Sequence, residues 1–164
     1  ENTIFVFVAA HVSSETFAPK TMTPTGHTHI VCLIYTPDGS LRGANRSVAQ
    51  QIDLMPTLLG LTGYDRPYFA FGRDVLRETD REPMVSNYAG GTYQGITDSL
   101  VLFFDGERTL SAYLRSDTLQ KNDISGIRTP ALEAAERDLK ARLQQYYQHV
   151  EKSDYLVKED STGR

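Results

Sequence analysis

The chain has 164 residues, of which 40% are hydrophobic and 23% charged, a composition that fits one globular domain or a piece of a larger one. The formal net charge is -4, which gives no indication of nucleic-acid binding, because proteins of that class present a basic surface. No apolar run approaches the roughly 20 residues of a membrane-spanning helix. The single cysteine, Cys32, excludes an internal disulfide bond and a zinc site built from paired thiols.

The first segment of the chain combines an apolar run with a polar cluster. Residues 4–10 are almost continuously apolar, which predicts a strand covered on both faces, as in a parallel α/β sheet. His11, Ser13, Ser14 and Glu15 follow directly. Because sites in open α/β sheets gather beyond the carboxyl ends of the strands, His11 is the first candidate for chemistry.

Residues 16–29 form a polar segment rich in threonine and proline, which predicts a loop. This loop carries His27 and His29, a His-x-His pair with a spacing seen in metal sites, although such a pair in a lone loop is more often incidental. A second apolar run at 30–35 predicts a second strand covered on both faces, with Cys32 as a small buried hydrophobic residue.

The clearest helix lies at 54–62. Pro56 cannot sit in a helix interior, so the helix starts just before it, with Asp53 as N-cap rather than as a catalytic acid, and Gly63 ends it. Its apolar residues are expected to form a well-buried face: Leu54, Met55, Leu58, Leu59 and Leu61.

The second half of the chain changes to short strands and then to a long helix. Runs at 84–88, 92–96, 100–104 and 109–114 are separated by turn residues, including an Asp-Gly pair, which predicts an antiparallel meander. Thr129 as N-cap and Pro130 at the first helical position open the last helix. Its apolar residues recur at steps of three and four: Leu132, Ala135, Leu139, Leu143, Tyr146 and Val150.

The order of these features resembles the C-terminal portion of the alkaline phosphatase/sulfatase superfamily. The residues that carry the resemblance are the strand-plus-histidine motif at His11, the strand ending in Tyr-Thr-Pro at 35–37, the segment QIDLMPTLLGLTGY at 51–64 and the Phe-Ala-Phe-Gly motif at 69–72. The bacterial membrane-anchored branch related to lipoteichoic acid synthases and phosphoethanolamine transferases is the most similar. The resemblance implies the C-terminal part of an alkaline-phosphatase-like α/β/α sandwich.

The resemblance also implies a site and a reaction. The family supplies an Asp-His pair of metal ligands after a core strand; His11 matches the histidine, whereas Ala10 stands where the aspartate is expected. His27 and His29 are candidates for substrate contacts in the following loop. The implied cofactor is a divalent metal (zinc, manganese, magnesium or calcium), and the implied substrate is an anionic sulfate or phosphate ester. The nucleophile belongs to the family's N-terminal part, so no catalytic residue is assigned here.

We therefore expect residues 1–82 to form the C-terminal portion of the sulfatase-like core, 83–128 the meander, 129–152 the closing helix and 153–164 a polar tail. A core strand that starts three residues after Glu1 leads us to expect an N-terminal part of the same protein as partner, carrying any membrane anchor, at an extracytoplasmic location. The first hypothesis is the C-terminal part of a metal-dependent hydrolase or phospho-group transferase, inactive as this chain alone. The second is a degenerate, non-catalytic binding or structural domain, which Ala10 motivates. A third is an independent α/β binding module.

Overall fold

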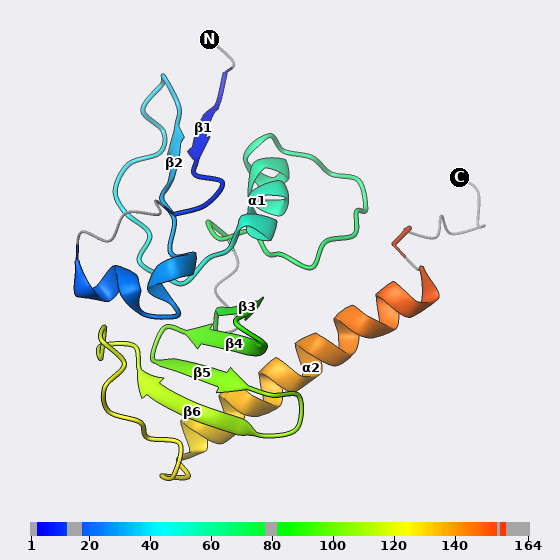
Figure 1. Cartoon of the computed structure of the whole chain (residues 1–164). Coiled ribbons are helices and arrows are strands. Elements are labelled where there is room, and N and C mark those ends of the chain that lie inside the picture. The colour runs from blue at the N-terminus through cyan, green and yellow to red at the C-terminus, as the bar shows by residue number, and fades with distance from the viewer. Residues whose placement is uncertain (1–2, 13–17, 78–81, 154, 157–164) are drawn as a thin grey trace.

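A computed structural model of the chain describes residues 3–12, 18–77, 82–153 and 155–156. Figure 1 shows a two-stranded ribbon and the short helix α1 on one side of a four-stranded meander, with the long helix α2 crossing behind the meander. The elements in chain order are β1 (Phe5–Val8), η1 (Pro19–Met22), η2 (Gly26–Thr28), β2 (Cys32–Tyr35), η3 (Gln51–Asp53), α1 (Leu54–Leu61), β3 (Met84–Ala89), β4 (Thr92–Thr97), β5 (Leu100–Phe104), β6 (Thr109–Leu114) and α2 (Pro130–Lys152).

The predicted meander is confirmed. Strands β3 to β6 pair in chain order, each antiparallel to the next. Gly90 and Gly91 both have positive φ values (61° and 81°), the backbone conformation that the two-residue turn between β3 and β4 requires. After β5, the carboxylate of Asp105 accepts hydrogen bonds from the amides of Glu107 and Arg108, which closes the next turn.

One face of the meander packs against the first half of α2 and forms the hydrophobic core. The helix begins where the sequence predicts, because the Thr129 hydroxyl accepts a hydrogen bond from the amide of Leu132 at 3.2 Å. Leu102, Phe104 and Leu139 are almost fully buried at the centre of this core. The second half of α2 extends past the sheet, so Tyr146 and Val150, which share the helical period of the core residues, are exposed.

Helix α1 is tied to residues 73–75 by two side chains one helical turn apart. The buried carboxylate of Asp53 accepts hydrogen bonds from the amides of Gln50 and Arg73, both at 2.9 Å. The buried Thr57 hydroxyl accepts one from the amide of Val75 at 3.1 Å. At Gly72 a Cβ atom would collide with the Ile52 carbonyl, so only glycine fits there. These contacts hold the 51–64 segment against the Phe-Ala-Phe-Gly motif and the residues that follow it.

Two details of α1 differ from expectation. Asp53 occupies the predicted N-cap position, but its side chain makes no capping hydrogen bond to α1 and bridges Gln50 to Arg73 instead. The predicted buried leucine face is wrong: Pro56 and Thr57 are the buried residues of this helix, while Met55 is exposed. The helix is held by its polar contacts to 73–75, and much of its apolar side is left uncovered by the described residues.

The apolar runs at 4–10 and 30–35 form a ribbon rather than part of a parallel sheet. Strands β1 and β2 pair antiparallel, with Phe7 opposite Leu33. Among the described residues one face of the ribbon lacks the predicted cover, since Phe7 is 57% exposed and Leu33 56%, whereas Val6 and Ile34 on the other face are half-buried. Cys32 is a free, exposed thiol, not a buried hydrophobic residue. The prediction failed because an apolar sequence specifies that a strand is to be covered, but not which segment covers it.

Glu136 on α2 supports a prediction about pH. Its carboxylate accepts hydrogen bonds at 2.7 Å from both the Lys140 ammonium and the Thr109 hydroxyl. The bond from Lys140, the largest cause, lowers the pKa of Glu136 below its usual value. A lowered folded-state pKa contributes stability above the unfolded-state pKa, which is lost as the pH falls through the folded-state pKa.

We therefore expect Glu136→Gln to lower the free energy of unfolding by about 1 kcal/mol at pH 7. The difference from wild type should shrink as the pH falls through the lowered folded-state pKa of Glu136, where the carboxylate of the wild type becomes protonated. Urea denaturation at pH 7 and pH 3 measures both values. An equal loss at the two pH values would show that the charge of Glu136 does not carry the effect.

Candidate functional site

His11 lies just beyond β1, as predicted, and its side chain is exposed. Its Nδ1 atom is 2.8 Å from the carbonyl oxygen of Val12. Because a carbonyl oxygen can only accept, Nδ1 carries the proton in this contact. In the neutral imidazole the lone pair is then on Nε2, which is the nitrogen free to accept a proton, bind a metal or contact a substrate.

The ribbon pairing ends just before His11. The Ala9 amide donates to the Val31 carbonyl at 3.1 Å, one residue beyond the last strand pair, Val8 and Cys32. The chain then bends at Ala10 and His11, so the strand pairing does not continue to His11 and His29. On the other side, the Gln51 side-chain amide donates to the Ala9 carbonyl at 3.1 Å, which ties the ribbon end to the start of η3.

His27 lies within η2, and His29 is the C-cap residue of that turn; both side chains are exposed. The fold of this segment depends on Thr23, whose carbonyl accepts from the His27 amide and whose hydroxyl accepts from the Gly26 amide, both at 3.1 Å. The Gln120 side chain donates to the Thr25 hydroxyl at 3.1 Å and anchors η2 to the loop after β6. The loop that the sequence predicts is therefore an ordered support for both histidines.

The described residues do not complete a metal site. Within residues 3–12, 18–77, 82–153 and 155–156, no group of three or more His, Cys, Asp or Glu side chains could hold a metal ion. Ser13, Ser14 and Glu15, the polar residues after His11, lie outside the described residues. His11 offers one nitrogen ligand, and Ala10 offers none. These residues do not by themselves fit the implied metal, and we derive no reaction step through it.

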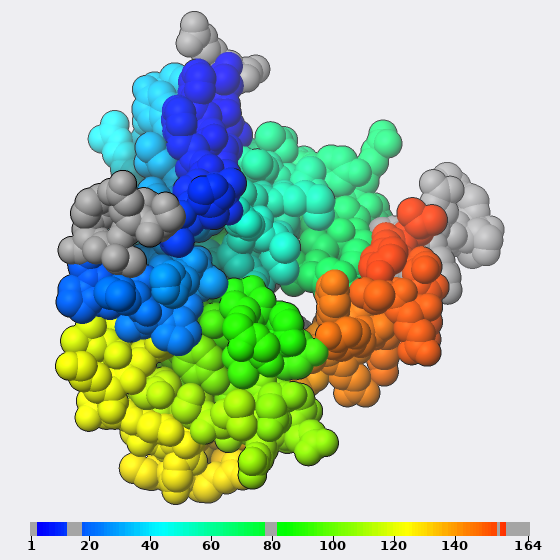
Figure 2. Space-filling view, in the orientation of Figure 1, coloured from blue at the N-terminus to red at the C-terminus, as the bar shows by residue number. Residues whose placement is uncertain are grey.

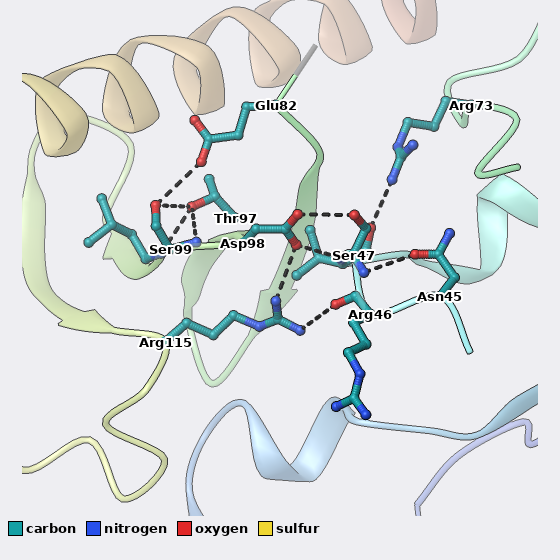
Figure 3. A network of polar contacts seen from close by, with 11 residues as sticks. Asn45, Arg46, Ser47, Arg73, Glu82, Thr97, Asp98, Ser99 and Arg115 are labelled. Atoms are coloured by element: carbon teal, nitrogen blue, oxygen red, sulfur yellow. Dashed lines mark hydrogen bonds and ion pairs between the residues drawn. The ribbon is translucent and has the colours of Figure 1, made fainter. Parts of the chain in front are cut away.

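Asp98 is the centre of a polar network that sequence reasoning missed (Figure 3). Its carboxylate accepts from the Val48 amide at 2.8 Å, the Ser47 hydroxyl at 3.0 Å and the Arg115 guanidinium at 3.1 Å. Arg115 also donates to the Arg46 carbonyl at 3.2 Å. Because Val48 lies 50 positions from Asp98 along the chain and Arg115 lies 17, only a turn could be predicted from the sequence around Asp98. The network joins the meander to the 46–48 segment that leads into η3.

Arg73 also contacts the segment that leads into η3. Its guanidinium donates to the Val48 carbonyl at 3.1 Å. An aromatic cluster makes a further connection, since the Phe69 ring lies 5.0 Å from that of Phe71 and 4.7 Å from the imidazole of His149 on α2. These contacts tie residues 69–73 to the 46–48 segment and to α2.

Comparison with known proteins gives a similarity of fold. A solved structure of an alkaline phosphatase superfamily protein from Vibrio parahaemolyticus superposes on this chain with a TM-score of 0.71 and 24% sequence identity. The match covers 96% of this chain and 37% of that protein. This chain has the fold of part of an alkaline phosphatase superfamily protein. The predicted fold class, mixed α/β with a meander and a C-terminal helix, is thereby confirmed.

No protein-family model and no curated protein matches the sequence. No helix among the described residues is both long and apolar enough to cross a membrane.

Proposed function

We propose that this chain is the C-terminal part of a metal-dependent hydrolase or phospho-group transferase that acts on a sulfate or phosphate ester. The observation that carries the proposal is the fold match over 96% of the chain to a protein of the alkaline phosphatase superfamily. The position of His11 beyond β1 supports it, because this is the edge where the resemblance expects a ligand. The extracytoplasmic location remains part of the proposal.

In this proposal the ribbon end receives the anionic group of the ester. His11 presents Nε2 outward, because Nδ1 is occupied by the Val12 carbonyl. His27 lies within η2 and His29 is its C-cap residue, both exposed, and in the proposal their protonated imidazoles would attract a sulfate or phosphate group. The nucleophile and the acidic metal ligand come from another part of the protein, so the 164-residue chain alone is inactive.

The partner that we propose is the preceding part of the same protein. The chain spans 37% of the length of the protein that it matches. The ribbon face that carries Phe7 and Leu33 is apolar and exposed, and a two-stranded ribbon is marginally stable in water when it is isolated. Further strands and helices packed against β1 and β2 would cover the residues that the sequence marks as core.

The second candidate, a degenerate and non-catalytic domain, is favoured by one observation. Ala10 stands where the resemblance expects an aspartate, and the described residues hold no cluster of metal ligands. A carboxylate neutralises a divalent ion and an alanine methyl group does not, so the metal affinity of this edge should be weak. The two candidates share one fold and differ in whether the complete protein turns over an ester.

Restoring the carboxylate tests whether this edge is a remnant of a metal site. We expect Ala10→Asp to bind Mn²⁺ or Zn²⁺ at least about tenfold more tightly than wild type, because a carboxylate and an imidazole then adjoin. Isothermal titration of the 164-residue chain measures the affinity. The double variant Ala10→Asp with His11→Ala should return to the wild-type affinity.

Ala131→Asp is the matched control. It adds the same charge at an exposed position in the first turn of α2, far from His11 along the chain. If Ala131→Asp strengthens metal binding as much as Ala10→Asp does, the gain comes from net charge alone, and the assignment of Ala10 and His11 to the pair is wrong.

A further inference from the structure

A cavity of about 440 Å³, open to solvent over much of its extent, lies between residues 22–24 at the end of η1 and the outer face of the meander. Figure 2 shows the η1–η2 segment lying directly against the loop that follows β6. Apolar walls come from Met22, Phe103, Leu110, Tyr113 and Leu119, and none of the lining residues is charged. Because an unpaired charge is costly to remove from water, such a cavity suits the neutral part of a molecule.

Gln120 in the cavity wall has two unusual features. Its backbone φ is 52°, the left-handed region that residues other than glycine rarely adopt. Its Nε2 group donates to Thr25, whereas its Oε1 atom is buried without a hydrogen-bond partner. A buried acceptor without a hydrogen-bond partner costs about 1–3 kcal/mol. Gln120 combines this cost with a strained backbone, and such a combination in a native structure requires an explanation. A ligand donor can pair with this acceptor if the side chain turns about its terminal bonds toward the cavity that Gln120 lines.

We propose that this cavity binds a small, uncharged organic molecule that has an apolar body and one N–H or O–H donor. The apolar body packs between Phe103, Tyr113 and Leu119, and the donor is accepted by Gln120 Oε1. The volume of about 440 Å³ is within the range of small-molecule sites in proteins, which sets the size of the proposed ligand. The neutral lining decides the charge class and separates this site from the histidine edge, where an anion is expected.

Occupancy of the cavity is coupled to η2 through hydrogen bonds. Thr23, a buried residue of the cavity wall, accepts from the amides of Gly26 and His27. Thr25, the residue before η2, is the partner of Gln120. A ligand that turns the Gln120 amide therefore acts on the residues that support His27. The ring resonances of His27 should shift on binding even though this side chain does not line the cavity.

The test uses N-phenyl-1-naphthylamine, a neutral aromatic molecule with a single N–H group whose fluorescence rises in apolar surroundings. We expect saturable binding of one molecule to the 164-residue chain, with shifts of the Gln120, Thr25 and His27 resonances in NMR spectra. Ser111→Phe, which fills the cavity, should abolish these changes. Gln120→Gly, which relieves the left-handed backbone and removes the acceptor, should weaken binding by about tenfold.

Ser153→Gly is the control for Gln120→Gly, because Ser153 also has a positive φ, at 51°, and lies at the end of α2. It should leave the affinity unchanged. The competing location for an apolar probe is the exposed ribbon. If Phe7→Ser abolishes the fluorescence change while Ser111→Phe and Gln120→Gly leave it intact, the cavity is not the binding site and the proposal fails.

Discussion

Asp53→Ala is expected to lower the free energy of unfolding by about 3–5 kcal/mol, since hydrogen bonds to a charged group contribute about 1.5–3 kcal/mol each. The variant removes the acceptor of the Gln50 and Arg73 amides and leaves both donors near the base of α1 without their partner. The loss of stability should extend to the candidate site, because the side chain of Gln51, two residues before Asp53, donates a hydrogen bond to the Ala9 carbonyl. Urea denaturation followed by circular dichroism measures the change.

Two further variants make this prediction specific. Asp53→Asn keeps one oxygen acceptor and should lose less stability than Asp53→Ala. Asp138→Ala removes an exposed carboxylate that pairs with Arg142 along α2, and should cost less than about 0.5 kcal/mol. If Asp53→Ala costs no more than Asp138→Ala, the carboxylate of Asp53 does not hold α1 to the 73–75 segment.

The second large effect concerns the ribbon. Because Phe7 and Leu33 are cross-strand partners, their side chains share one exposed apolar face. We expect the 164-residue chain to self-associate through this face and its free strand edges. The double variant Phe7→Lys with Leu33→Lys should raise the dissociation constant of self-association at least about tenfold, because two charges would have to be buried in the contact. Sedimentation velocity over a range of concentrations measures it.

The matched control adds the same charge elsewhere. Leu110→Lys with Ile127→Lys also replaces two exposed apolar residues, on β6 and in the loop before α2. This pair should leave self-association nearly unchanged. Equal loss of association in both double variants would show that net charge, not the ribbon face, sets the association.

Elements with local signals could be predicted from the sequence, whereas contacts between distant segments could not. Thr129 with Pro130 specifies the start of α2, and the Asp-Gly pair at 105–106 specifies a turn, because each acts within a few residues. Asp53 could be placed at the helix start, but its second partner, Arg73, lies 20 positions away. The apolar runs of β1 and β2 correctly predict two strands. They incorrectly predict that both strands are buried, because burial depends on which other segments pack against them.

The candidate site was predictable in part. A histidine directly after an apolar run placed His11 at a strand end, and the structure puts it there. That β1 and β2 pair directly and antiparallel was missed, because the continuous apolar runs suggested a parallel sheet. Gln51, Thr23 and Gln120, which support the candidate residues, carry no pattern of their own, because their roles depend on partners elsewhere in the fold.

The most direct test of the proposed function is to express the complete open reading frame that encodes this chain and to assay it with bis(p-nitrophenyl) phosphate and p-nitrophenyl sulfate, with and without EDTA. We predict ester turnover that EDTA abolishes, a loss of at least about a hundredfold in kcat/KM for His11→Ala, and no turnover by the 164-residue chain alone. Turnover by the isolated chain, or by the complete protein in EDTA, would contradict the proposal. A complete protein that folds and shows no turnover would establish the non-catalytic alternative.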